Sequence, residues 1–428
     1  MTAHPAAVLL LDLVVIAGAA RILGLLARRL GQPAVIGEIL GGILLGPTLF
    51  GGALTRTLFP AEVQPWLTML ANVGVAVFMF LVGVELDRNL LRGQGRIASG
   101  VALCAIVLPF ALGGVLALYL LGHHPSTKQP AFVLFLGTAM AITAFPVLAR
   151  ILTDRGLLAT PIGALALACA SIDDILAWSL LAVVTALAGA AAGLWQVLLV
   201  VPYAAVLLLV VRPLLARSAA RAETAGWTRR PVSGRVGAAG VLVIVAGGLW
   251  LSAEATQWMG LHLIFGAFLF GVAMPRDHGA RLRAWTQRWV GRTCSVLLLP
   301  IFFMVAGTSV DLSKVDGKAL LDLGLILLVA IGGKGLGAFA GARLSGVQPR
   351  HSAVLAILLN TRGLTELIAL TVGLQLHVID TGLYSLMVVM ALVTTAMTGV
   401  LLRFVYPEKR ARADMGPRTT IAESEALS

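Results

Sequence analysis

Long apolar runs recur along the whole chain, and they constrain its fold more than any other feature. We count thirteen such segments, each long enough to cross about 30 Å of hydrocarbon. Over such lengths, only helices satisfy their own backbone polar groups in lipid. The sequence therefore predicts an all-α polytopic membrane protein with about 13 transmembrane helices. The segments cover approximately residues 6–27, 33–49, 66–86, 97–121, 131–152, 161–188, 194–212, 236–255, 260–275, 294–310, 319–342, 351–374 and 382–405.

The composition excludes most other protein classes. Of 428 residues, 59% are hydrophobic and only 12% are charged, whereas soluble proteins carry about 25% charged residues. A soluble enzyme, a disordered chain and an ordinary nucleic-acid-binding protein are therefore excluded, and membrane lipid is the expected surrounding. The three cysteines have no metal-ligand spacing, and we expect no cofactor.

The net charge of +12 carries information about orientation. Alternate loops, with the adjoining segment ends, hold 25 Lys and Arg on one side and 4 on the other. Positive residues collect in cytoplasmic loops. We therefore expect an odd number of spans in the cytoplasmic (inner) membrane, with the N-terminus outside and the C-terminus in the cytoplasm. The polar tail 406–428 is too short for a regulatory domain.

Several charged residues fall inside apolar segments, where each costs several kcal/mol and is a functional candidate. Asp173 and Asp174 are adjacent near the middle of segment 161–188. Consecutive helical residues point about 100° apart, so one carboxylate can line a cavity while the other contacts a neighbouring helix. Lys334, within a glycine-rich stretch of segment 319–342, is the expected counter-charge.

Two segments carry signs of a broken helix. Pro146 removes a backbone donor in segment 131–152, which frees carbonyl groups around Ile142 and Thr143 as ligands for a hard cation. The stretch 360–367 interrupts segment 351–374 with polar residues and a glycine. Broken helices in corresponding positions of two halves are typical of inverted-repeat transporters with a site at the midplane. Arg362 and Glu366 lie four residues apart, and a simple mutual neutralisation stays open for them.

Five motifs in order resemble the second family of monovalent cation:proton antiporters. They are QPAVIGEILGGILLGP, FLVGVELD, TAFPVLARIL, SIDDILAW and NTRGLTEL, within residues 30 to 400. The resemblance implies the sodium/proton antiporter fold, an inverted repeat with two crossed, partly unwound helices, and a homodimer. It also implies a mobile core of about residues 97–188 and 319–405, and a dimerisation scaffold of about residues 6–86 and 194–310, together forming one membrane domain over 1–405.

The resemblance also assigns roles residue by residue. Asp174 resembles the principal carboxylate for the transported monovalent cation and the proton, and Asp173 resembles the residue that pairs with Lys334. Glu366 matches a carboxylate near the helix crossing, where it would offset half-helix dipoles. The full candidate site comprises Asp174, Asp173, Lys334, Thr143 and Ile142, with supporting residues Glu366, Asn360, Thr361, Arg362 and Ser171.

The leading functional hypothesis is therefore secondary antiport of Na⁺ or K⁺ against H⁺, with no enzymatic activity. A sodium-coupled organic-solute symporter of the same general fold is the alternative, although that function would not explain the buried Lys334. An intramembrane aspartyl protease is disfavoured because its two carboxylates must face one water, which adjacent residues cannot do. A cation channel is disfavoured because the sequence has no repeated carbonyl filter.

Overall fold

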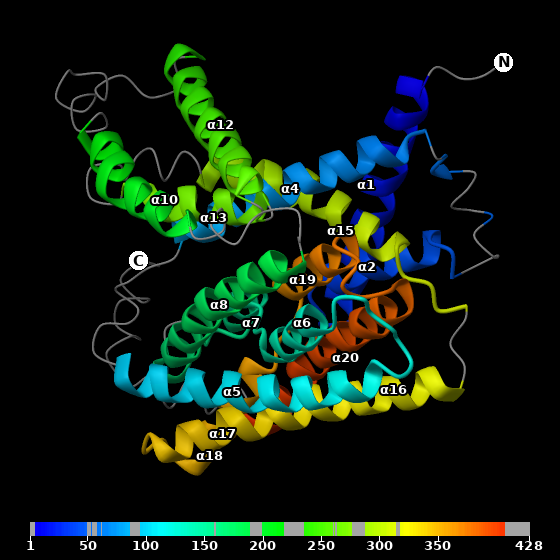
Figure 1. The fold of residues 1–428 in the computed structure, drawn as a ribbon, viewed down its shortest axis with the longest axis vertical. Coiled ribbons are helices and arrows are strands. Elements are labelled where there is room, and N and C mark those ends of the chain that lie inside the picture. The colour runs from blue at the N-terminus through cyan, green and yellow to red at the C-terminus, as the bar shows by residue number, and fades with distance from the viewer. Residues whose placement is uncertain are drawn as a thin grey trace, which may run out of the picture. The chain divides into compact units, whose positions relative to one another are not determined.

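The computed structural model is helical throughout its regular elements. It describes residues 5–48, 53, 58–60, 62–85, 95–157, 160–188, 199–217, 235–259, 261, 263–275, 287–313 and 317–406, and the tail 407–428 lies outside them. All elements assigned in these residues are α-helices or π-helical turns, and Figure 1 shows their arrangement. The predicted all-α class is confirmed.

The described part of the chain contains eight helical stretches that are long and apolar enough to span a membrane. A ninth is formed by two helices, Pro349–Leu359 and Leu364–Gln375, that meet at an angle of 43°. Three shorter apolar helices cover Ala34–Leu45, Gln129–Ala141 and Leu263–Ala273. The protein is therefore a multi-pass membrane protein, while the count of thirteen spans stays a prediction.

The chain divides into two compact units. Unit 1 comprises Met1–Arg21, Leu54–Leu86 and Thr185–Val305, and unit 2 comprises Ile22–Ala53, Asp87–Val184 and Ala306–Ser428. Three helices run from one unit into the other: α1 (Pro5–Arg29), α8 (Pro161–Ala188) and α15 (Leu299–Thr308).

The other elements of unit 1 are α4 (Gln64–Glu85), α10 (Val200–Val206), η3 (Leu207–Val211), α12 (Arg235–Trp258), α13 (Leu263–Ala273), η4 (Gln287–Gly291) and η5 (Cys294–Leu298). The other elements of unit 2 are α2 (Ala34–Leu45), α5 (Gly95–Leu120), α6 (Gln129–Ala141), α7 (Phe145–Asp154), α16 (Gly317–Leu328), η6 (Val329–Gly333), α17 (Lys334–Leu344), α18 (Pro349–Leu359), α19 (Leu364–Gln375) and α20 (Thr381–Val405).

Unit 1 is organised around the close crossing of α4 and α13. A Cβ atom at Gly83 would lie 2.3 Å from the Phe268 carbonyl oxygen, and one at Gly271 would lie 2.1 Å from the Phe80 carbonyl oxygen. Small residues let helices in a membrane approach closely, which replaces the hydrophobic driving force that lipid cannot supply. Next to this crossing, the rings of Phe80 and Phe270 stack with their centroids 5.6 Å apart.

Unit 2 contains the candidate site, and its helices pack through a similar close approach. In Figure 1, α5 lies alongside the continuous helix formed by α16, η6 and α17. A Cβ at Gly337 of α17 would lie 2.4 Å from the Cys104 carbonyl oxygen of α5. Behind this contact, a buried apolar cluster joins residues of α5, α7, α8, α17, α18 and α20, which gives the charged site a rigid surrounding.

Both predicted helix breaks are present in unit 2. Helix α6 ends at Ala141 and α7 begins at Phe145, so Pro146 occupies the first turn of a new helix, where a missing N–H costs little. Helix α18 ends at Leu359 and α19 begins at Leu364. Before α19, Gly363 has φ of +152°, a backbone conformation that residues with a Cβ rarely adopt.

The contact between α17 and α5 gives a stability prediction. Gly337→Ala should lower the free energy of unfolding by about 1–3 kcal/mol, because the added methyl group forces the two helices apart. Gly335→Ala is the matched control, since a Cβ there would meet no atom of another helix within 4 Å. Thermal unfolding in detergent measures both, and equal melting temperatures would contradict the packing described.

Candidate functional site

Asp173 of α8 is the centre of a buried hydrogen-bonded group. Its Oδ2 lies 2.7 Å from Lys334 Nζ and accepts a hydrogen bond of 2.6 Å from the Thr143 hydroxyl. The Lys334 ammonium also donates to the carbonyl of Ala141, the last residue of α6. Asp173 is 1% exposed, while Lys334 and Thr143 are fully buried. The structure thus brings together three residues that the sequence placed in one candidate site.

A π-helical turn directly precedes Lys334. The five residues Val329–Gly333 form η6, between the α-helical stretches α16 and α17. Such π-helical turns are rare in proteins, and those that occur are often found at functional sites. The π-helical turn η6 was not predicted from the sequence, although Gly332 and Gly333 mark this stretch.

Asp174 is equally buried but differs from Asp173 in its surroundings. The residue is 2% exposed, and within the described part of the chain its Oδ1 has no hydrogen-bond partner. A buried carboxylate oxygen without a donor is costly unless it binds a proton or a cation. The Asp173 Oδ1 also lacks a partner among the described residues, but its Oδ2 binds Lys334 and Thr143. The two adjacent aspartates therefore differ in the partners of their second oxygen, in agreement with their 100° separation on the helix.

Arg362 joins the two broken helices. Its Nη1 donates to the Ala139 carbonyl and its Nη2 to the Met140 carbonyl, each at 2.5 Å. Nη1 also lies 3.0 Å from Glu366 Oε2, within a fully buried ion pair. The last carbonyls of α6 therefore face two cationic groups, from Arg362 and Lys334, which complement the negative end of the helix dipole.

The backbones of the two breaks also contact each other. The Ala144 N–H donates to the Thr361 carbonyl at 2.9 Å, and the Thr361 hydroxyl donates to the Leu358 carbonyl at 2.7 Å. Asn360 is 3% exposed, and among the described residues its Oδ1 has no hydrogen-bond partner. The Thr395 hydroxyl of α20, which sequence reasoning missed, lies 2.6 Å from the Arg362 carbonyl oxygen.

Two further predicted residues have more local roles in the described geometry. Ile142 terminates α6 in an extended conformation, and its N–H donates to the Thr138 carbonyl at 3.1 Å. Ser171 donates its hydroxyl to the Leu167 carbonyl of its own helix at 2.8 Å. Such back-bonding satisfies a hydroxyl inside an apolar helix.

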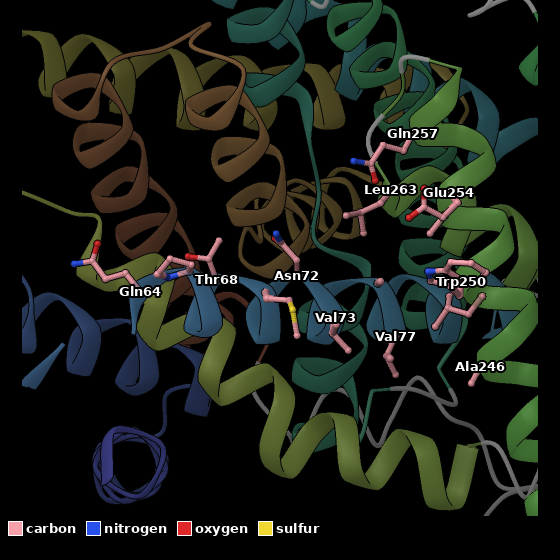
Figure 2. Close-up of a pocket in the computed structure, with 15 residues that line it drawn as sticks. Gln64, Thr68, Asn72, Val73, Val77, Ala246, Trp250, Glu254, Gln257 and Leu263 are labelled. Carbon is pink, nitrogen blue, oxygen red and sulfur yellow. The ribbon is translucent and has the colours of Figure 1, made fainter. Parts of the chain in front are cut away.

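Unit 1 contains a separate cavity of about 900 Å³, which contains none of the predicted site residues. Figure 2 shows it between α4 and α12, with Asn72 on α4 and Trp250, Glu254 and Gln257 on α12 around it. Its walls are largely apolar. Periodicity could indicate that these residues lie on helices, but not that the two helices diverge to leave this space.

Taken together, these features define a class: a multi-pass membrane carrier whose charged centre lies at the meeting point of two broken helices. The family described as "Sodium/hydrogen exchanger, transmembrane" matches residues 15–406. The chain belongs to this family. Its members are transporters, which confirms both the resemblance drawn from the five motifs and the prediction that the protein is not an enzyme.

Individual relatives support the same assignment. The chain is 40% identical over 410 residues to "Na(+)/H(+) antiporter NhaS4" of Synechocystis sp., covering 93% of this chain and 97% of that protein. It is 37% identical to "Cation/H(+) antiporter 20" of Arabidopsis thaliana, covering 94% of this chain and 49% of that protein. The structure of the sodium proton antiporter MjNhaP1 from Methanocaldococcus jannaschii shares the fold, with a TM-score of 0.64, 17% identity and coverage of 96% of this chain and all of that one.

The buried Arg362–Glu366 pair gives a prediction about stability. Arg362→Ala should lower the free energy of unfolding by about 3–5 kcal/mol, because it leaves a buried carboxylate without its cation. The double variant with Glu366→Gln should recover part of that loss, since it removes the unpaired charge. Chemical or thermal unfolding of both variants in detergent measures the difference. Equal losses in the single and double variants would contradict the cost assigned to the unpaired Glu366 carboxylate.

Proposed function

We propose that this protein is a secondary antiporter that exchanges Na⁺ or K⁺ for H⁺ across the membrane by alternating access. The cation and the proton compete for the carboxylate of Asp174. Family membership supports the class of transport, and the names of the two relatives support exchange of a cation against protons. Neither relative is named as a symporter of organic solutes, so the alternative is not favoured.

The observation that carries this proposal is the balance of charge in the buried site. Three buried carboxylates, of Asp173, Asp174 and Glu366, face two buried cations, of Lys334 and Arg362. Lys334 is paired with Asp173 and Arg362 with Glu366. One negative charge is left over on Asp174, for which the described residues give neither an ion pair nor a hydrogen-bond partner at Oδ1. One proton or one monovalent cation would neutralise it.

The surrounding oxygen atoms suit either occupant. Hard cations prefer carboxylate, hydroxyl, amide and carbonyl oxygens. Asp174 would bind the cation, helped by oxygens of Ile142, Thr143, Ser171, Asn360 and Thr361. Lys334 and Arg362 would hold Asp173, Glu366 and the α6 carbonyls in place, so that the occupant meets a preorganised site.

Alternating access requires that one part of the protein move against another. We assign movement to the core helices of about residues 97–188 and 319–405, and a stationary dimerisation role to about residues 6–86 and 194–310. The assignment is supported by unit 2, which contains every residue of the candidate site and nearly all of the two core ranges; the assignment differs from unit 2 in placing Ile22–Ala53 with the scaffold. The protein would act as a homodimer in the cytoplasmic membrane, with its N-terminus outside and its C-terminus inside.

Asp174→Asn should abolish cation-dependent proton flux while the protein stays folded, because an amide can coordinate a cation but cannot release a proton. Asp174→Glu should retain part of the exchange. The measurement uses proteoliposomes with an internal pH indicator and pulses of Na⁺, K⁺, Li⁺ or Rb⁺. Asp311→Asn is the matched control for removing an acidic side chain outside the site. Exchange at the wild-type rate by Asp174→Asn would exclude Asp174 from the mechanism.

The proposed orientation predicts which face each loop occupies. In a background with all three cysteines replaced, Gln348→Cys should react with an impermeant maleimide only from the cytoplasm. Ser313→Cys should react only from outside. Both positions are exposed: Gln348 directly precedes α18, and Ser313 lies between α15 and α16. Labelling of the two variants from the same side, or with the sides reversed, would contradict the orientation assigned from the Lys and Arg count.

A further inference from the structure

A cluster of two histidines and two aspartates lies at one end of unit 2, apart from the candidate transport site. His123 and His124 follow the last turn of α5, Asp322 lies in α16, and Asp380 caps the N-terminus of α20. His123 Nδ1 lies 3.1 Å from both carboxylate oxygens of Asp322. His124 Nδ1 lies 2.8 Å from Asp380 Oδ2, and its Nε2 lies 3.8 Å from Asp322 Oδ2.

This geometry suits a charged His124 ring. Each ring nitrogen faces a carboxylate, whereas a neutral imidazole has only one N–H to donate. The side chain of Asp322 is 2% exposed and that of His124 is 13% exposed, so water gives them little screening. The His124 ring is therefore held between a carboxylate of α16 and one at the start of α20.

The charged groups around the His124 ring come from α16, from the start of α20 and from the loop after α5. From α16 the facing group is Asp322, and from the start of α20 it is Asp380. His123 contacts the same Asp322 carboxylate. Lys128, further along the loop after α5, directs its Nζ to the Leu376 carbonyl at 2.9 Å. Burial would raise the pKa of Asp380, but hydrogen bonds from His124 and the Leu383 N–H hold that pKa below its usual value.

A proton fits this cluster better than a metal ion. Among the residues that the structure describes, no group of three or more His, Cys, Asp or Glu side chains is arranged to hold a metal. Histidine, in contrast, is the residue type whose charge changes between about pH 5 and 8. The cluster therefore has the chemistry of a pH-dependent contact between helices.

The helices that the cluster joins lead to the transport site. Helix α16 continues through η6 to Lys334, and α20 carries Thr395, whose hydroxyl contacts the Arg362 carbonyl. The loop after α5 is further attached by the Ser126 hydroxyl, which donates to the Val378 carbonyl at 3.1 Å. The cluster therefore lies at the ends of two helical elements, one continuing to Lys334 and one contacting the Arg362 backbone.

We propose that His124, with His123, Asp322 and Asp380, forms a regulatory proton-binding site separate from Asp174. With His124 protonated, the cluster fastens the ends of α5, α16 and α20 and slows exchange; loss of the proton releases them and speeds exchange. The three chain segments involved belong to the set of loops poor in Lys and Arg, so the site would sense external pH. This regulatory role rests on the proposed antiport, whereas the pH-dependent contact does not.

The contact is tested by hydrogen exchange of the full chain in nanodiscs at pH 6.0 and 8.5, corrected for intrinsic rates. In the wild type, amides in 121–128 and 376–383 should be protected at pH 6.0 and lose protection at pH 8.5. His124→Gln should give low protection at both, and His124→Lys, which keeps its charge, high protection at both. His377→Asn, at an exposed histidine of the same segment, should behave as the wild type. Equal protection of the wild type at the two pH values would overturn the proposal, whatever the variants do.

The regulatory consequence is tested by cation-driven proton flux in proteoliposomes with fixed internal pH. At external pH 6.0, His124→Gln should exceed the wild type about threefold, the factor that a partly exposed ion pair typically contributes. At external pH 8.5 the two should be equal, and His124→Lys should stay slow. If the wild type and both His124 variants show the same dependence of proton flux on external pH, the regulatory role is overturned. An absence of wild-type flux with every cation would instead overturn the antiport, and hydrogen exchange would still decide the contact.

Discussion

The ammonium group of Lys334 is the interaction on which the rest of the site depends. It is fully buried and lies between the Asp173 carboxylate of α8 and the Ala141 carbonyl at the end of α6. An unpaired ammonium in this position would cost several kcal/mol. Because both partners come from other helices, Lys334 links α17 to the end of α6 and to the buried face of α8. The π-helical turn before Lys334 and the close contact of Gly337 with α5 both lie next to Lys334 and help to position its ammonium group.

The two helix breaks are stabilised by the charges they expose. Interrupting a helix in a membrane leaves carbonyl groups at one end and N–H groups at the other without partners. At the end of α6, the carbonyls of residues 139–141 bind Arg362 and Lys334. At the start of α19, Glu366 lies in the first turn, where a negative charge is favourable. The open question of whether Arg362 and Glu366 merely neutralise each other therefore has a fuller answer: the pair also holds the two breaks together.

Much of this arrangement could be predicted from the sequence, because charge and proline are conspicuous in an apolar chain. The sequence identified the two helix breaks and the charged residues Asp173, Asp174 and Lys334, because charged residues and proline are unfavourable inside an apolar helix. What the sequence did not contain was the identity of tertiary partners. Nothing local indicates that Arg362 reaches the carbonyls of α6, or that His124 meets residues 322 and 380. The cavity of unit 1 was missed for the same reason, since it depends on the angle between helices.

Under the proposed function, the same charge balance also explains why exchange would be obligatory. With one proton or one cation on Asp174, the buried group of three carboxylates and two cations is neutral. Without either, it carries a negative charge in surroundings of low dielectric, and that state is the most expensive to enclose. The transition between the outward-facing and inward-facing states would therefore be fast with a proton or cation bound to Asp174 and slow without either. Coupling of the two fluxes would then follow from the cost of one uncompensated carboxylate, with no separate gate against leakage.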